Sequence, residues 1–200
     1  MIKFASKVIR PPSGAAPSAR SAPIACAPLV LLTDARKVGM PADTLDMDVP
    51  SLVGTLASGS MVERSAAADK VWQIADSHEA RHAIVKAGGI RHLVALAEQG
   101  SPKGKENAVG ALCNLAVDEE NRGLMKDADA IPLLIDLVMD GTATARDHAA
   151  STLAYLSYQP DCKVAIRVGG GIGAILELTR SASPSTKVLA AKALSVLQAG

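Results

Sequence analysis

The chain has 200 residues, room for one domain or a short array of repeats, and 48% of them are hydrophobic. Its 21 basic and 20 acidic residues leave a net charge of +1, which excludes a global basic field for nucleic acid. Only 2% of residues are aromatic and no apolar run nears the roughly 18 residues of a membrane-spanning helix, which excludes an all-β fold and a membrane protein. The 36 alanines predict closely packed helices instead.

Residues 1–47 differ in composition from the rest of the chain. They hold six of the 11 prolines, and Met1 to Thr33 carry four basic side chains and no acidic one. Alanine and serine fill most of the remainder. Such a segment cannot bury enough apolar surface to fold, and its composition is typical of organelle transit peptides. We therefore expect a disordered leader, which is either a transit peptide or upstream sequence wrongly joined to the true start.

From Asp48 onward the sequence repeats every 41 residues without gaps. The units are 48–88, 89–129, 130–170 and 171–200, or about 3.7 copies. Small and aliphatic residues form the clearest columns, namely Ala67, Ala108, Ala149, Ala190 and Val71, Leu112, Leu153, Leu194. Another column, Gly88, Asp129 and Gly170, stands at the end of each full unit. The domain prediction is a leader over 1–47 and one repeat domain over 48–200.

Within a unit the apolar residues recur at i, i+3, i+4 and i+7, which is one face of a helix. The residues Ala108, Ala111, Leu112 and Leu115 form one such face. A second face comes before it, at Ile90, Leu93, Val94 and Ala97, and the stretch 122–127 predicts a third, shorter helix. Gly- and Asp-containing turns divide these helices. The sequence therefore predicts an all-α fold with three helices in each unit.

His78, Glu79 and His82 have the H-E-x-x-H spacing, in which two histidines share one helix face and bind zinc while the glutamate acts as a base. The next histidine, His92, fits no common spacing for a third ligand. The segments 119–123 and 160–164 occupy the same columns in later units, so the repeat already explains this stretch. We predict no metal and no cofactor, and keep a zinc hydrolase as the alternative function.

No other stretch predicts catalysis. Gly169 to Gly173 is rich in glycine, but no strand precedes it and no suitably placed lysine follows, so we expect a turn and not a phosphate-binding loop. The cysteines Cys26, Cys113 and Cys162 lack the C-x-x-C spacing of a cysteine-rich zinc site. We therefore predict no catalytic residues and a protein that is not an enzyme.

The stretch 100–108, followed by Ala111 to Ala116 and by Ala130 to Leu134, resembles an armadillo repeat. The resemblance covers residues 48–200. The repeats are similar to those in the arrays of U-box and vacuolar scaffold proteins. It implies a right-handed α-α superhelix in which the third helix of every repeat, the one that carries Ala108 to Leu115, lines a concave groove. It also implies a scaffold or adaptor that binds an extended peptide or a partner helix. No Cys-Pro-Ile start of a U-box occurs in the chain.

Two ladders of side chains lie opposite the core face of the predicted third helices. The resemblance implies that an Asn at position 114 bonds the ligand backbone and that a Trp at position 110 stacks on its side chains. Here Asn114 occurs once and position 110 is Gly110, which argues against recognition of a nuclear signal. The predicted partner-binding groove consists of Asp69, Trp72, Gln73, Glu106, Gly110, Asn114, Asp147, Ser151, Tyr155 and Lys192.

Three groove residues leave alternatives open. Trp72 is either a peptide anchor or a side chain that packs against the leader or the first unit's neighbours and caps the array. Tyr155 with Tyr158 forms either a hydrogen-bonding patch or a contact between adjacent helices. Asn114 is either a ligand clamp or a bond to a neighbouring turn.

The partner is predicted to be another protein, with no nucleic acid and no membrane insertion. The last repeat has no covering unit, so we expect the leader and a partner, self-association or further repeats to cover the ends of the array. A fragment of a ubiquitin-ligase or trafficking adaptor is a further alternative function. The expected location is intracellular, cytoplasmic or nuclear, or plastid or mitochondrial if the leader is a transit peptide.

Overall fold

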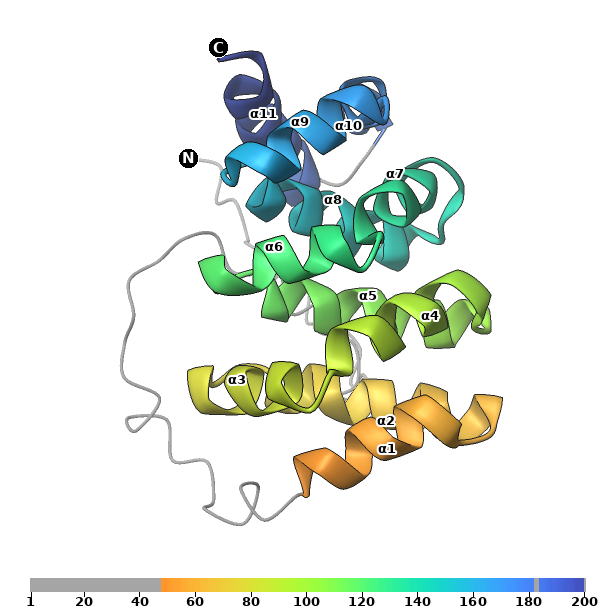
Figure 1. Ribbon diagram of the computed structural model, residues 1–200. Coiled ribbons are helices and arrows are strands. Elements are labelled where there is room, and N and C mark those ends of the chain that lie inside the picture. The colour runs from red at the N-terminus through yellow and green to blue at the C-terminus, as the bar shows by residue number, and fades with distance from the viewer. Residues whose placement is uncertain (1–47, 182–183, 200) are drawn as a thin grey trace, which may run out of the picture.

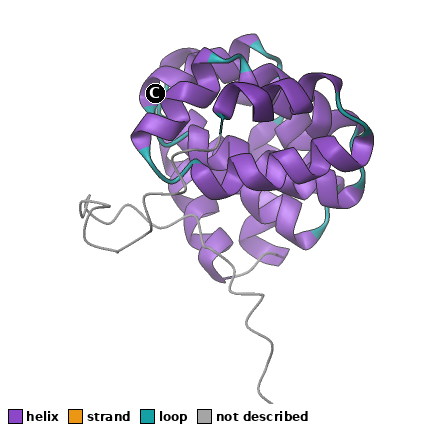
Figure 2. Cartoon of the chain, turned by 90° about the horizontal axis from the view of Figure 1, so that it is seen from below, coloured by secondary structure: helices purple, strands orange, loops and turns teal. Residues whose placement is uncertain are grey.

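The computed structural model describes residues 48–181 and 184–199, and every regular element in them is a helix (Figure 1). The predicted leader, residues 1–47, lies outside the described residues. The helices are α1 (Val49–Ser58), α2 (Met61–Ile74), α3 (His78–Lys86), α4 (Gly89–Gln99), α5 (Pro102–Leu115) and α6 (Glu119–Asp127). They continue with α7 (Ala130–Asp140), α8 (Ala143–Leu156), α9 (Pro160–Val168), α10 (Gly171–Ser181) and α11 (Pro184–Gln198). Short loops join them (Figure 2).

The helices follow the 41-residue period of the sequence. The helices α2, α5, α8 and α11 begin at residues 61, 102, 143 and 184, and α3, α6 and α9 begin at 78, 119 and 160. The first set stacks along the long axis, α2 on α5, α5 on α8 and α8 on α11, behind α1, α4 and α7 (Figure 1). This arrangement confirms the predicted all-α solenoid.

The core consists of the predicted columns. Val71, Leu112 and Leu153 are fully buried, and alanines such as Ala108 and Ala149 between them let neighbouring helices approach closely. Each buried leucine contributes about 1.5–3 kcal/mol of apolar transfer free energy. One cluster of buried residues extends from α1 to α11, so adjacent units share a continuous core.

Recurring residues also set the helix starts. The hydroxyls of Ser60, Ser101 and Thr142 accept hydrogen bonds from backbone N–H groups in the first turns of α2, α5 and α8. Such caps contribute about 1 kcal/mol each. The caps stand at the equivalent position of each unit, at the start of α2, α5 and α8, and these helices carry the predicted groove residues.

The column at the end of each full unit has a left-handed backbone. Its φ values are +80° at Gly88, +56° at Asp129 and +81° at Gly170. Glycine adopts this conformation without strain and aspartate tolerates it, which explains the composition of the column. In the described part of the chain, no helix combines the length and the apolar composition that crossing a membrane requires.

Candidate functional site

One aromatic contact joins three successive third helices. The indole of Trp72 on α2 lies across Gly110 on α5, where a Cβ atom would stand 2.8 Å from Trp72 Cε2. His148 on α8 meets the same indole edge to face, with ring centroids 5.0 Å apart and an interplanar angle of 78°. A side chain at position 110 is therefore excluded by an indole that the preceding unit supplies.

Trp72 remains partly accessible at this position. Its side chain is half-buried, and its ring N–H donates to no acceptor among the described residues. Trp72 thus packs against residues of the next two units, and its side chain stays partly accessible.

Asn114 bonds a neighbouring unit. Its Nδ2 donates to the backbone oxygen of Trp72 at 3.1 Å and lies 3.5 Å from Asp76 Oδ1. This is the neighbouring-turn alternative. The carbonyl oxygen of the Asn114 side chain accepts no hydrogen bond from the described residues, so one acceptor remains on this side chain.

The predicted acidic groove residues are held by hydrogen bonds within the solenoid. Glu106 accepts from the Thr142 hydroxyl at 2.6 Å and lies 3.5 Å from the Lys103 ammonium group. Asp147 accepts from the Thr186 hydroxyl at 2.7 Å. These bonds link one unit to the next, so both carboxylates stabilise the stack as well as giving it charge.

The remaining predicted groove residues differ in exposure. Gln73 and Lys192 are exposed, and Asp69, which accepts from Gln73 at 2.7 Å, is half-buried. Ser151 is buried and its hydroxyl donates to the Asp147 carbonyl of its own helix. Tyr155 is half-buried against the core.

Burial changes the titration of two of these side chains. Burial lowers the pKa of His148 and outweighs the nearby carboxylates of Asp147 and Glu106, which act in the opposite direction. The imidazole against Trp72 is therefore neutral at pH 7. Burial likewise raises the pKa of the Tyr155 hydroxyl, which stays protonated.

An open pocket of about 430 Å³ lies between the amino-terminal halves of α2 and α5. Asn107 lines it and is 3% exposed, and its Nδ2 donates to the Ser65 carbonyl at 3.1 Å. Its Oδ1 is buried without a partner. The pocket wall consists of Met61, Val62, Ser65, Ala66, Asp69, Ser101, Lys103 and Asn107.

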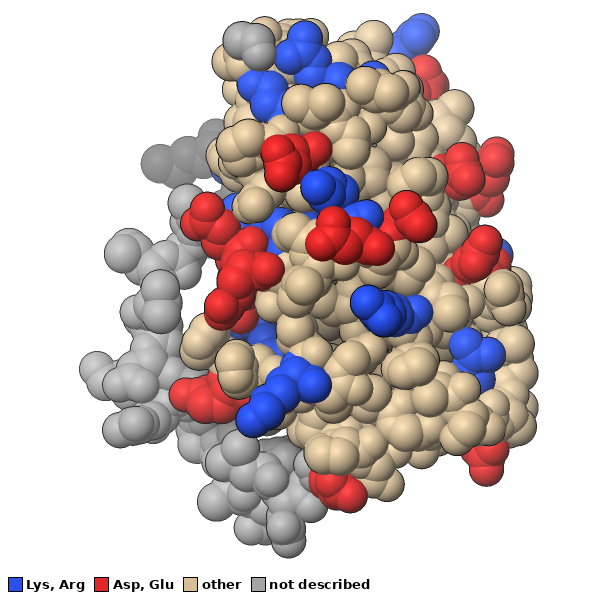
Figure 3. Space-filling model, viewed as in Figure 1, with Lys and Arg blue, Asp and Glu red and all other residues tan. Residues whose placement is uncertain are grey.

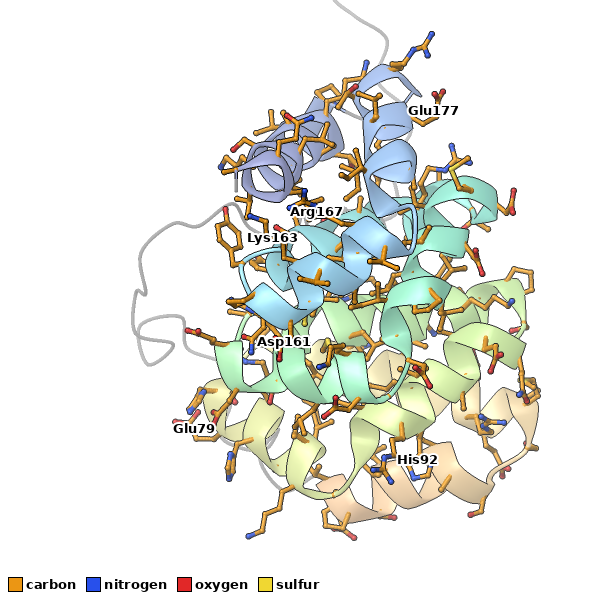
Figure 4. All side chains as sticks on the ribbon, turned by 45° about the horizontal axis from the view of Figure 1, so that its top comes forward. Glu79, His92, Asp161, Lys163, Arg167 and Glu177 are labelled. Atoms are coloured by element: carbon orange, nitrogen blue, oxygen red, sulfur yellow. The ribbon has the colours of Figure 1, made fainter. Side chains whose placement is uncertain are left out.

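Two side chains of the H-E-x-x-H stretch on α3, His78 and Arg81, take part in a different contact. Arg81 holds Asp118 through two hydrogen bonds of 2.7 and 3.0 Å, and His78 Nδ1 lies 3.2 Å from the same carboxylate. Figure 4 places His92 on α4, well apart from Glu79. Within residues 48–181 and 184–199, no group of three potential ligands could hold a metal ion.

Two features of the site were missing from the sequence prediction. The column of His148 contains a histidine only once, because Asn107 and Ala66 occupy the equivalent positions of the earlier units. No repeat signal therefore marked His148. A basic column was present but unused: Arg64, Lys105 and Arg146 each donate to backbone carbonyls at the end of the preceding helix. These bonds satisfy helix carbonyls that would otherwise lack partners.

Comparisons with known proteins agree with this architecture. The Armadillo/beta-catenin-like repeat family matches residues 77–117. The sequence has no significant match among curated proteins. Computationally designed armadillo repeat proteins for modular peptide recognition share 25% identity at a TM-score of 0.72, covering 76% of this chain and 66% of theirs.

Two further structures are similar. An engineered protein shares 29% identity at a TM-score of 0.69, with 75% of this chain and 62% of that chain covered. A designed armadillo repeat protein in complex with the peptide (KR)4 shares 23% identity at a TM-score of 0.67, covering 74% of this chain and 64% of that one. This chain thus spans less than two thirds of the length of both. Residues 77–117 match the armadillo repeat family, and the described helices form the same solenoid as designed armadillo repeat proteins.

Proposed function

We propose that this protein is a non-enzymatic scaffold that holds an extended peptide of a partner protein in the groove formed by α2, α5, α8 and α11. The observation that carries the proposal is the fixed, half-exposed indole of Trp72. Gly110 beneath it and His148 beside it hold the ring in one orientation, so a ligand that stacks on it loses little further entropy.

One polar group on Trp72 and one on Asn114 suit an extended backbone. The Trp72 ring N–H is a donor and the Asn114 side-chain oxygen is an acceptor, and neither has a partner among the described residues. A peptide backbone offers one acceptor and one donor per residue. The pocket of about 430 Å³ beside Asp69 would take one ligand side chain.

The fold supports the same class of function. Stacked repeats leave an extended surface and no deep catalytic pocket. Proteins of this architecture therefore usually bind other proteins. The designed armadillo relatives are described by modular peptide recognition and by a complex with (KR)4. The alternative zinc hydrolase would need a third ligand beside His78 and His82.

The test is a peptide-display selection on the full chain, followed by affinity measurements with the selected peptides and with (KR)4. Trp72→Ala should weaken binding at least tenfold, and Trp72→Phe should weaken it less, because a ring remains. Val164→Ala, on the exposed surface of α9, is the matched control and should bind as the wild type does. If peptides bind Trp72→Ala with unchanged affinity, the peptide-binding surface lies elsewhere on the protein.

The cellular location of the protein is a separate proposal. We propose an intracellular location, and imaging of the full chain with a carboxyl-terminal tag tests it. A tagged protein found in plastids or mitochondria would identify residues 1–47 as a transit peptide.

A further inference from the structure

Arg81 and Arg122 stand at equivalent positions of successive units, but only Arg81 has a carboxylate partner. Its Nε and Nη2 donate to the two carboxylate oxygens of Asp118 at 2.7 and 3.0 Å. The residue one period after Asp118 is Gln159, so the next interface offers a neutral side chain at that position. Arg122 accordingly forms no ion pair with any described residue. A half-buried cation is thus left without a counter-charge.

The guanidinium group of Arg122 bonds the backbone with the nitrogens that Arg81 uses for its carboxylate. Nη1 of Arg81 donates to two carbonyls just after the end of α2, at 3.2 and 3.0 Å, which leaves Nε and Nη2 for Asp118. Nε and Nη2 of Arg122 instead donate to the equivalent carbonyls after α5, both at 3.0 Å. Nη1 of Arg122 therefore donates to no described residue.

Two phenol groups lie near this guanidinium group. Tyr155 is in the last turn of α8, Tyr158 follows just after it, and α8 stacks on α5. Burial raises the pKa of the Tyr155 hydroxyl, the charge of Arg122 acts in the opposite direction, and Tyr158 raises it further. Acidic side chains lie over the middle of the molecule, around α6 (Figure 3), but no carboxylate contributes to this shift. The Tyr155 hydroxyl is thus within electrostatic reach of Arg122 and away from the acidic surface.

Three donors therefore lie near one another without an acceptor. They are Nη1 of Arg122 and the hydroxyls of Tyr155 and Tyr158, none of which donates to a described residue. Solvent reaches the cluster: Tyr158 is 57% exposed, and the enclosed unpartnered side-chain atoms of the described residues belong to Asn107 and Arg146. A guanidinium group binds a carboxylate through two parallel hydrogen bonds, and hydroxyls add further donors.

We propose that Arg122, Tyr155 and Tyr158 bind the side-chain carboxylate of an aspartate or glutamate in the peptide of a partner protein. The carboxylate takes the place that Asp118 has one unit earlier. The guanidinium group turns as in the earlier unit, so that Nη1 donates to the two carbonyls while Nε and Nη2 donate to the ligand. Tyr155 stands one period after Asn114 on the predicted groove, so the inference rests on the proposed function and names one residue of its peptide.

The direct test uses small probes on the full chain and needs no peptide. The probe is N-acetylglutamate with its α-carboxyl group blocked as the methylamide, and the matched neutral probe is the glutamine analogue. Titrations at constant ionic strength follow the Nε–H NMR signal of Arg122. The glutamate probe should shift that signal and saturate in the millimolar range, and the glutamine probe should not. N-acetylalanine carries the carboxylate of a chain end, and tighter binding of it would overturn the side-chain assignment.

Substitutions locate the site. Gln159→Asp supplies a carboxylate from within the chain and should abolish the shift caused by the glutamate probe. Gln159→Asn offers α9 a similar cap without the charge, so it should bind the probe as the wild type does and unfold about 2–4 °C below Gln159→Asp. Tyr158→Phe should weaken probe binding at least threefold. Glu119→Gln, which removes an exposed carboxylate at the position equivalent to His78, should tighten it.

The peptide-display selection connects this site to the groove. Peptides selected on the wild type should share an acidic residue at one position, and that preference should disappear on Gln159→Asp. The inference is overturned if the glutamate probe leaves the Arg122 signal unmoved, if the glutamine probe moves it equally, or if Gln159→Asp binds the probe as before. Peptide binding that depends on Trp72 would stand in each of those cases. A probe that binds while no peptide depends on Trp72 would overturn the groove and leave the carboxylate site.

Discussion

The indole of Trp72 occupies the space that a side chain on Gly110 would need. A Cβ at position 110 would lie 2.8 Å from Trp72 Cε2 and 2.9 Å from Cδ2, closer than carbon atoms approach without one of them moving. Glycine inside α5 thus costs helix propensity and gains a fixed aromatic ring on the groove. The contact links α2 of the first unit to α5 of the second.

Gly110→Ala should therefore destabilise the protein by about 1–3 kcal/mol, because the added methyl group displaces the ring. The control is Gly123→Ala on α6, where nothing lies within 4 Å of the new Cβ. That substitution should stabilise by about 0.5–1 kcal/mol, as an alanine does in a helix. Urea unfolding measures both. A neutral Gly110→Ala would show that the ring moves aside freely.

Protonation of His148 should weaken the fold. Burial lowers its pKa, so the unfolded chain takes up a proton at a higher pH than the folded chain does. Stability is then complete above the ordinary histidine value of about 6.5 and falls as the pH drops through that value toward the lowered one. His148→Gln should flatten the pH dependence of unfolding between about pH 7 and 5.

The only tryptophan in the chain reports the same event. A protonated imidazole quenches indole fluorescence, so Trp72 emission in the folded protein should fall with a midpoint below about 6.5. His92→Gln, on α4, should leave that titration unchanged. A titration that persists in His148→Gln would assign the quenching to another group.

Arg81 and Asp118 form a bond between α3 and the start of α6 that should contribute to stability. Their side chains are only 11% and 15% exposed, and the guanidinium group bonds both carboxylate oxygens. Burial alone would raise the pKa of Asp118, but Arg81 and His78 outweigh it and hold the pKa below its ordinary value. The stability this adds is present above about pH 4 and is lost as the pH falls further.

Asp118→Asn should cost about 1–3 kcal/mol at pH 7, since Arg81 loses a charged partner in a poorly solvated place. Asp161→Asn is the comparison: its carboxylate is 78% exposed and lies 3.7 Å from Lys126. It should cost less than about 1 kcal/mol. Thermal unfolding at pH 7 distinguishes the two. Equal costs would mean that burial of the Arg81 pair adds nothing.

The sequence predicted the structural features that recur in every 41-residue unit. The columns through Leu112 and Ala108 gave the core, and the column Gly88, Asp129 and Gly170 gave the turns, because every unit must meet the same packing demand. Contacts that occur once have no column to mark them. The edge of His148 against Trp72 is of this kind. Asn114, which bonds the Trp72 carbonyl, occurs once as well and was singled out only through the family resemblance. Those single contacts distinguish this groove from a uniform array.

Backbone conformation alone should separate two glycines that have equal space around them. Neither Gly54 on α1 nor Gly88 has an atom within 4 Å of an added Cβ, but Gly88 has a φ of +80° whereas Gly54 is helical. Gly88→Ala should cost about 1–2 kcal/mol, because the left-handed region strains an L side chain. Gly54→Ala should instead stabilise by about 0.5–1 kcal/mol.

Urea unfolding of the two variants beside the wild type checks this pair. The unfolded chain loses the same freedom in both, so the difference between them isolates the folded-state strain at residue 88. Gly170→Ala, with a φ of +81° and the same open surroundings, should repeat the loss seen at Gly88. If Gly88→Ala and Gly54→Ala shift stability equally, the turn between α3 and α4 adjusts its backbone, and the left-handed column does not constrain the stacking of successive units.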